Sequence, residues 1–306
     1  MSYLDRIAAC NRFDLSRFLP FLVDGVRYGW VLPEFARLLR RWPTVFTVAA
    51  DAVSLDPRLD DYHRRREAVA EVVARLAEEG VIRGWRGENY PVALAYDAPA
   101  AFEIERAAVP HFGFRAWGVH VNGLVRRGGE TLVWVGQRAA DKETFPAMLD
   151  HLAAGGQPVG IGLLDNVVKE CGEEAGVPPE LARRARYVRQ LHYCCETPTG
   201  LKPDTIFIYD LELPEDFTPC NIDGEVERFF LWTLDEVADV VANTTRFKPN
   251  CNLVLIDLLR REQRLGVDPA ERQRIVDALD VGLACDRSRS QFPAKDQCED
   301  AKNGTG

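Results

Sequence analysis

The sequence predicts an α+β protein in two parts, a small α+β domain over residues 1–112 and a larger domain over residues 113–283. The chain has 306 residues, of which 46% are hydrophobic, enough for two domains with cores of their own. Helical patterns and a hairpin fill the first part, and from Arg115 onward the pattern changes to strands. The end of the chain is polar and rich in small residues, so residues 284–306 are predicted to be a disordered tail.

The first part contains one hairpin signal and two helix signals. Asp24-Gly25 separates two apolar stretches and favours the positive φ angles of a tight turn. Helical periodicity predicts one helix over residues 33–41 and a longer amphipathic helix over residues 60–79, which Gly80 ends. The apolar stripe of the longer helix is formed by Val69, Val72, Val73 and Leu76.

The second part opens with strands and ends with helices. Strands are predicted over residues 117–125 and 131–137, separated by the turn Arg127-Gly128-Gly129. A glycine-bearing loop over residues 155–162 leads into a helix. Further strands are predicted at 187–195, 205–213 and 225–232, and further helices at 234–242, 252–262 and 269–279.

Composition excludes several function classes. Lys and Arg total 38 against 47 Asp and Glu, a net charge of -9, so nucleic acid and anionic membranes are not expected partners. The sequence has no apolar run of about 18 residues and no basic-then-hydrophobic N-terminal segment, which predicts a cytoplasmic protein. Its eight cysteines include no C-x-x-C pair and are expected to be free thiols.

Three glutamates carry the chemistry that the sequence predicts. Positions i, i+3 and i+4 share one helix face, so Glu170, Glu173 and Glu174 are expected to project together. Such a cluster is commonly a solvated helix face, but this helix follows a glycine loop and is stopped by Gly176. Clustered carboxylates repel one another unless cations bind, and their hard oxygens favour Mg²⁺ or Mn²⁺. The buried stripe is predicted to be Leu164, Val167, Val168, Cys171 and Ala175.

Residues 155–177 resemble the Nudix box, the diphosphate hydrolase signature G-x5-E-x7-R-E-U-x-E-E-x-G-U, in which U is bulky and aliphatic. Gly155 takes the first position, Lys169-Glu170 stands for R-E, and Gly176-Val177 closes the match. Ile161 replaces the first Glu and Lys169 replaces the Arg. In the wider family these two residues pair to brace the loop, so their joint loss is interpreted as one coordinated change. The resemblance implies a Nudix α/β/α sandwich with a mixed sheet.

The flanking motifs resemble one branch of the family, the Nudix proteins similar to thiamine diphosphate phosphatase, known from plants and fused to thiamine pyrophosphokinase in yeasts. That branch carries a poorly characterised N-terminal domain, which is expected here to close over the substrate or to form a homodimer contact. The motifs are residues 115–120, 137–142, 148–152, 203–213, 223–227 and 247–251.

The resemblance implies metal-dependent hydrolysis of thiamine diphosphate, or of its damaged oxo and oxy forms, to the monophosphate and phosphate. Glu170, Glu173 and Glu174 would hold the metal and lower the pKa of a bound water. The general base would be a glutamate of the box, or Glu225 or Glu227, which strand alternation places on one face. Candidates for holding the diphosphate are Arg138, Lys142, Gly155, Gly156, Lys248 and Asn250.

Three alternatives stay open. An isopentenyl diphosphate isomerase would need a cysteine acid just before the glycine loop, where this chain has residues 152–155 without one. The box alone permits hydrolysis of ADP-ribose, a dinucleotide or a nucleoside triphosphate equally well. A Nudix domain retained only to bind a ligand usually has eroded metal ligands, whereas this chain keeps all three glutamates.

Overall fold

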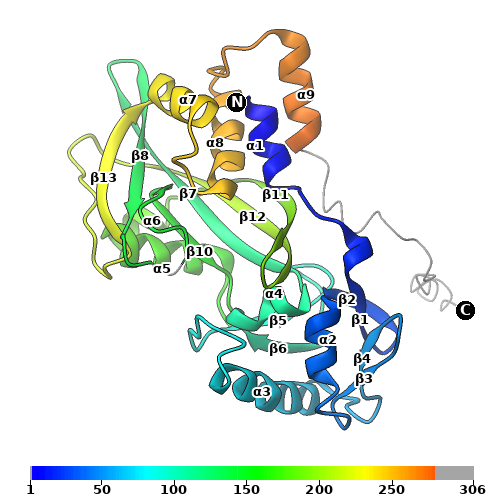
Figure 1. The fold of residues 1–306 in the computed structure, drawn as a ribbon. Coiled ribbons are helices and arrows are strands. Elements are labelled where there is room, and N and C mark those ends of the chain that lie inside the picture. The colour runs from blue at the N-terminus through cyan, green and yellow to red at the C-terminus, as the bar shows by residue number, and fades with distance from the viewer. Residues whose placement is uncertain (1, 143, 280–306) are drawn as a thin grey trace, which may run out of the picture.

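The computed structural model describes residues 2–142 and 144–279. The tail predicted over residues 284–306 lies outside these residues. The described chain forms a seven-stranded sheet flanked by helices, with a smaller α+β part below it in Figure 1. This arrangement confirms the predicted fold class.

The smaller part contains two sheets, one with the strand order β2-β1-β4-β3 and one made of β5 and β6. Asp24 and Gly25 have φ angles of 51° and 77° between β1 and β2, which confirms the predicted hairpin turn. The strands are β1 (Leu19–Val23), β2 (Val26–Val31), β3 (Phe46–Val48), β4 (Val53–Leu55), β5 (Asn89–Val92) and β6 (Phe102–Glu105).

The helices of the smaller part include both predicted ones, α2 (Pro33–Leu39) and α3 (Tyr62–Glu78). Asp61 caps α3 by accepting a hydrogen bond from the backbone N–H of Arg64. The predicted stripe is buried against the two sheets, as Val69, Val72, Val73 and Leu76 belong to the core of this part. Short helical segments complete it: η1 (Leu15–Arg17), η2 (Arg106–Ala108) and α4 (Val109–Phe112).

The larger sheet is mixed, as the sequence implied. Its strand order is β11-β12-β7-β8-β13, with β10 paired to β7 and β9 to β8. β7 and β12 run parallel, and the other pairs are antiparallel. The strands are β7 (Ala116–Arg127), β8 (Glu130–Arg138), β9 (Leu149–Asp150), β10 (Ala153–Gly156), β11 (Arg186–Thr197), β12 (Gly200–Glu212) and β13 (Val226–Thr233).

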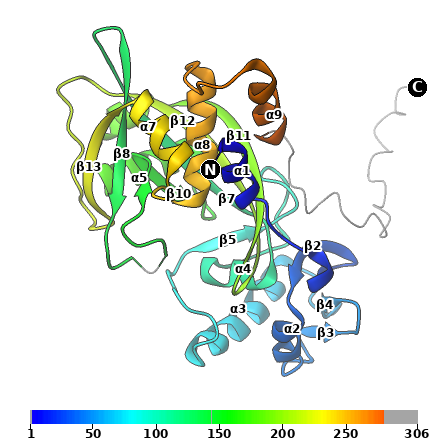
Figure 2. The ribbon, with the colours of Figure 1, turned by 45° about the horizontal axis from the view of Figure 1, so that its top comes forward.

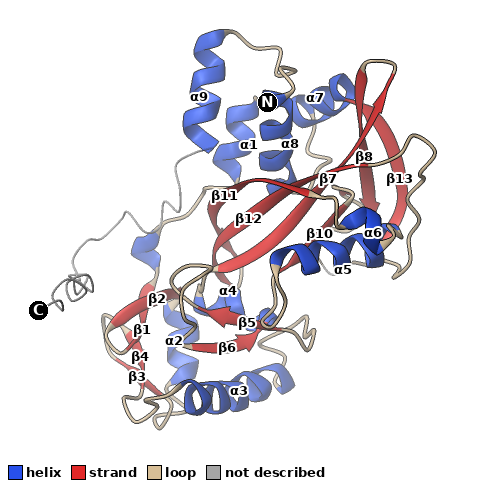
Figure 3. Cartoon of the chain, turned by 180° about the vertical axis from the view of Figure 1, so that it is seen from behind, coloured by secondary structure: helices blue, strands red, loops and turns tan. Residues whose placement is uncertain are grey.

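Helices cover both faces of this sheet, and each face has its own apolar core (Figures 1 and 3). On one face lie α5 (Leu163–Ala175) and α6 (Pro179–Ala182). The other face is covered by α7 (Leu234–Asn243), α8 (Pro249–Arg261) and α9 (Pro269–Leu279). The helix expected over residues 252–262 begins earlier than predicted, because Pro249 occupies its first turn. No helix among the described residues is long and apolar enough to cross a membrane.

Helix α1 (Tyr3–Ala9) packs in the larger part, although the sequence placed residues 1–112 in one domain. Tyr3 and Ile7 belong to the same apolar core as α7, α8 and α9, and Figures 1 and 2 show α1 beside α8 and α9. Buried Arg6 donates a hydrogen bond from Nε to the carbonyl of Val241, 2.9 Å away. The chain therefore starts in one part and crosses to the other, and a domain boundary at residue 112 stays a prediction for the residues after α1.

Candidate active site

Helix α5 presents the glutamates because the neighbouring apolar stripe of the helix is held in the core. Val167, Cys171 and Ala175 are fully buried, as predicted. Leu164 is 37% exposed, which corrects the prediction that it belongs to this stripe. Leu163 packs against the core in its place, four residues before Val167. The helix ends as predicted at Gly176, which has a φ angle of 62° and donates its N–H back to the last turn.

Two of the three glutamates are buried under β10. Glu174 accepts a hydrogen bond from the backbone N–H of Ala154, 3.0 Å away. Glu170 lies against Gly155, where a Cβ atom would be 2.0 Å from the carboxyl carbon of Glu170. The side chain of Glu173 is half exposed at the edge of the same helix. Glycine at position 155 is thus required for the close approach of Glu170 to the strand.

The electrostatics of this pair favour a bound cation. Burial raises the pKa of Glu174 well above its ordinary value, and the charges of Asp150 and Glu170 raise it further. Burial also raises the pKa of Glu170, although Lys169 opposes the shift. Carboxylates that are costly to ionise together become stable when a divalent ion binds them, and hard oxygen donors suit Mg²⁺ or Mn²⁺. The residues present therefore fit such an ion.

The glycine segment is a strand followed by a braced loop. Gly155 and Gly156 lie in β10 and pair with Val119 and Gly118 of β7, where the sequence predicted only a loop. The side chain of Asn166, which sequence reasoning did not single out, donates to the carbonyl of Gly156 at 2.8 Å. This bond fixes the start of α5 to the end of β10.

Lys142 and Glu225, predicted as a diphosphate ligand and a general base, form an ion pair of 2.5 Å. Burial opposes ionisation of Glu225, but Lys142 outweighs it and lowers the pKa of this glutamate. The charge of Glu225 also contributes to the raised pKa of Glu174, so the two carboxylates share one electrostatic environment. Glu225 is therefore ionised at neutral pH, and its charge acts on Glu174 of α5.

Glu227 does not share a face with Glu225 in the way that strand alternation predicts. The register of β13 against β8 shifts between Val226 and Arg228, so Glu227 is the extra residue of a β-bulge. Its side chain is exposed. Because a bulge interrupts the period of two, sequence alternation could not locate Glu227.

Arg138 and Lys248, two further candidates for holding the diphosphate, both bind buried Asp150. Arg138 Nη1 is 3.2 Å and Lys248 Nζ is 3.1 Å from Asp150 Oδ2. Burial opposes ionisation of Asp150, but its cationic neighbours lower the pKa of this carboxyl strongly. Asp150 belongs to the flanking motif at residues 148–152, but the sequence predicted no function for it. Asn250, the remaining candidate, donates to the hydroxyl of Tyr193 at 3.4 Å.

Asp150 is also the centre of a cluster of buried groups that could ligate a metal. The ligand atoms of His120, Asp150, His151 and Cys251 all lie within 4.8 Å of one another. Burial lowers the pKa of both histidines, so their rings are neutral. Cys251 Sγ donates to Asp150 at 2.8 Å. Since Arg138 and Lys248 already compensate the charge of Asp150, electrostatic repulsion disfavours a divalent ion here.

The smaller part of the chain contacts the site through β5. The backbone N–H of Val159 donates to the carbonyl of Asn89 at 2.9 Å. Tyr90 packs so closely that a Cβ atom at Gly156 would be 1.4 Å from its hydroxyl oxygen. The ammonium group of Lys169 is 3.4 Å from Glu88, the residue just before β5. The segment that leads into the glutamate helix is therefore held by residues far away in sequence.

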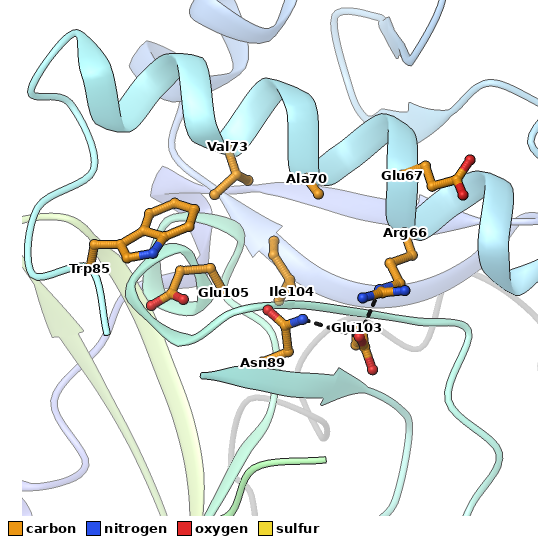
Figure 4. A pocket seen from close by; sticks show the side chains of 9 residues that line it. All are labelled: Arg66, Glu67, Ala70, Val73, Trp85, Asn89, Glu103, Ile104 and Glu105. Atoms are coloured by element: carbon orange, nitrogen blue, oxygen red, sulfur yellow. Dashed lines mark hydrogen bonds and ion pairs between the residues drawn. The ribbon is translucent and has the colours of Figure 1, made fainter. Parts of the chain in front are cut away.

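A separate cavity of about 470 Å³ lies between α3 and the β5–β6 pair (Figure 4). Arg66 and Glu103 form an ion pair of 2.7 Å at its edge, and Asn89 donates to Glu103 at 3.0 Å. Figure 4 shows Trp85 at the far end from this pair. The lining residues are Arg66, Glu67, Ala70, Val73, Trp85, Asn89, Glu103, Ile104 and Glu105.

Comparison with known proteins gives matches over both parts. A family model described as a domain of unknown function, DUF4743, matches residues 2–116. The chain is 43% identical to Nudix hydrolase 20, chloroplastic, and to Nudix hydrolase 24, chloroplastic, both of Arabidopsis thaliana, covering 85% of this chain and 72% of each relative. It is 30% identical to an uncharacterized protein of Saccharomyces cerevisiae, covering 78% of this chain and 75% of that relative.

Among solved structures, an Ap4A hydrolase of C. elegans matches at a TM-score of 0.37 and 13% identity, covering 48% of this chain and 98% of that one. Identity to the two Arabidopsis proteins extends over most of the chain and most of each relative. The chain therefore belongs to the Nudix hydrolases, pyrophosphohydrolases that act on diphosphate substrates and typically use a divalent metal.

Proposed function

We propose that this Nudix hydrolase cleaves the diphosphate of thiamine diphosphate, or of its oxo and oxy analogues, to the monophosphate and phosphate. The observation that carries the proposed chemistry is the burial of Glu170 and Glu174 together against β10, with Glu173 on the same helix. The choice of substrate is supported by the flanking motifs, two of which meet where Lys248 binds Asp150.

We propose that Glu170, Glu173 and Glu174 hold Mg²⁺ or Mn²⁺. A bound divalent ion neutralises phosphoryl oxygens and lowers the pKa of a water molecule. The ionised carboxylate of Glu225 is positioned by Lys142 and is the proposed acceptor of the proton from that water. Glu173 and Glu174 are retained as candidate bases, and Glu227 is the weakest candidate because of the bulge.

The diphosphate is proposed to bind beside the glutamates. Arg138, Lys142 and Lys248 supply positive charge, each from an existing ion pair with a carboxylate. Candidates that contribute polar backbone or amide groups are Gly155, Gly156 and Asn250. An anionic substrate would compete with Asp150 and Glu225 for these cations.

The test is phosphate release with Mg²⁺ and with EDTA from a substrate panel. The panel contains thiamine diphosphate, its oxo and oxy analogues, ADP-ribose, NADH, a mixture of deoxynucleoside triphosphates and isopentenyl diphosphate. Metal-dependent turnover confined to the thiamine compounds is the expected result. Turnover of ADP-ribose or NADH instead would support Nudix chemistry and contradict the proposed thiamine substrate. Absence of turnover with intact ligand binding would indicate a binding module.

A cytoplasmic location and a homodimer stay predictions. The expectation that the protein binds neither nucleic acid nor membranes also stays a prediction. Both Arabidopsis relatives are named chloroplastic. Fractionation of cells that express the protein, and its mass in solution, would test location and oligomeric state.

A further inference from the structure

Lys169 lies among three carboxylates. Its Nζ atom is 3.2 Å from Glu170 and 3.5 Å from Glu173, on its own helix, and 3.4 Å from Glu88. The ammonium group of Lys169 thus already provides a cation to two of the three glutamates on α5.

Glu88 is held firmly beside this lysine by the smaller part of the chain. Arg106 Nη1 donates to Glu88 at 2.7 Å, and the backbone N–H of Arg106 donates to the carbonyl of Glu88 at 2.9 Å. The next residue, Asn89, accepts the hydrogen bond from Val159 in the loop before α5. Glu88 thus has both its side chain and its backbone fixed relative to the glutamate helix.

A divalent ion and the ammonium group of Lys169 compete for the carboxylates of Glu170 and Glu173. When an ion binds these oxygens, it repels the nearby ammonium group, which then needs another anionic partner. Glu88 is the carboxylate that can keep Lys169 without taking part in the cluster on α5. Its own second partner, Arg106, keeps it ionised and oriented.

We propose that Glu88 is a positioning residue. It holds the ammonium group of Lys169 when a divalent ion replaces that group on Glu170 and Glu173. Through this contact the smaller part of the chain sets the metal affinity of the hydrolase site. The inference rests on the proposed role of these glutamates as metal ligands. It assigns to the smaller part a function in the reaction that does not require contact with the substrate.

The test is direct binding of Mn²⁺, measured by the loss of the free-ion electron paramagnetic resonance signal. Glu88→Gln is expected to weaken Mn²⁺ binding about tenfold, because Lys169 then remains on Glu170 and Glu173. Lys169→Gln removes the competitor and is expected not to weaken binding. In the double variant the effect of Glu88→Gln is expected to shrink to about twofold or less.

The controls separate the possible causes. Glu103→Gln removes a carboxylate of the neighbouring strand β6 that faces Arg66 instead, so it is expected to leave Mn²⁺ binding unchanged. Glu88→Asp keeps the charge on a shorter side chain and is expected to weaken binding less than Glu88→Gln. Circular dichroism establishes that each variant is folded.

Two results would overturn the proposal while the metal site survives. An equal effect of Glu88→Gln with and without Lys169 would mean that Glu88 attracts the ion directly. Wild-type binding by Glu88→Gln would mean that it has no role. If the wild-type protein binds no Mn²⁺, the proposed metal function fails together with the role of Glu88.

A kinetic measurement separates an effect on metal affinity from an effect on catalysis. Glu88→Gln is expected to raise the Mg²⁺ concentration for half-maximal rate and to preserve kcat at saturating Mg²⁺.

Discussion

Single residues decide how closely the strands and the glutamate helix approach each other. Gly155 illustrates this, because the carboxyl group of Glu170 fills the space that a side chain at position 155 would need. The sequence identified Gly155 by its place in the motif, but the reason for glycine is a contact between residues on different elements. Asp150 illustrates the opposite case, since three of its hydrogen bonds come from Arg138, Lys248 and Cys251, which local patterns could not connect to it.

Gly155→Ala is expected to displace Glu170 and to lower metal-dependent phosphate release on the order of a hundredfold, since small shifts of catalytic groups have effects of this size. Gly172→Ala is the matched control within the same motif, because the nearest atom to its Cβ is 3.9 Å away. That control lies inside α5 and is expected to raise the free energy of unfolding by about 0.5–1 kcal/mol. Equal activities of the two variants would contradict this explanation.

His111 gives a prediction on pH. It is 7% exposed and packs against Phe35, and burial lowers the pKa of its ring to about 4. As the pH falls, the His111 ring of the unfolded chain takes up a proton near pH 6.5, whereas the same ring in the folded chain takes it up only near pH 4. Stability from this group is fully present above about pH 6.5 and is lost as the pH falls toward 4, by up to about 1.4 kcal/mol per pH unit.

The measurement is urea unfolding of the wild-type protein and of His111→Phe between pH 7 and pH 4. The variant lacks the titrating ring, so its free energy of unfolding is expected to fall less steeply over this range. Parallel curves for the two proteins would show that His111 makes no such contribution.

Among the elements, those with strong local patterns were predicted well. The hairpin at Asp24-Gly25 and the helices α3 and α5 follow from turn chemistry and apolar periodicity, which act over a few residues. Strand β10 was missed because its glycines and alanines have no strand pattern, and pairing with β7 alone makes it a strand. The bulge at Glu227 was missed because a register shift depends on the partner strand.

The end of α5 gives a prediction at this scale. Gly176 has a left-handed backbone, and a Cβ atom there would be 2.5 Å from Cys220 Sγ. Gly176→Ala is therefore expected to lower the free energy of unfolding by more than the roughly 1 kcal/mol of backbone strain alone. Gly224→Ala, also at positive φ but with no atom near its Cβ, measures the strain without the clash. Equal losses in urea unfolding would exclude the contact with Cys220.

At the scale of the whole molecule, some segments that are distant in sequence meet in ways that the sequence could not reveal. Helix α1 begins the chain but packs with α7, α8 and α9. Glu88 and Lys169 are 81 positions apart and meet at the site. Local patterns predict which segments are helices or strands, but they carry no information on which distant segments meet. Family resemblance supplied the location of the candidate site, whereas the proposed role of the smaller part is argued from contacts in the structure.

The contact between Tyr90 and Gly156 tests how the parts are joined. Gly156→Ala is expected to destabilise the protein, because its Cβ would overlap the Tyr90 hydroxyl and push β5 away from β10. Tyr90→Phe removes the overlapping oxygen, so the double variant is expected to unfold at a higher urea concentration than Gly156→Ala alone. Additive losses in the double variant would mean that the two residues are not coupled.

The proposed metal site is tested by the Mg²⁺ dependence of phosphate release by wild-type protein and Glu174→Gln, with the best substrate of the panel. Because Glu174 is buried beside Glu170 and contributes to the proposed metal site, the substitution is expected to lower kcat on the order of a hundredfold or more. Glu180→Gln, on the exposed side of α6, should match the wild type. Retention of wild-type, Mg²⁺-dependent activity by a folded Glu174→Gln protein would contradict the assignment of the metal site to α5.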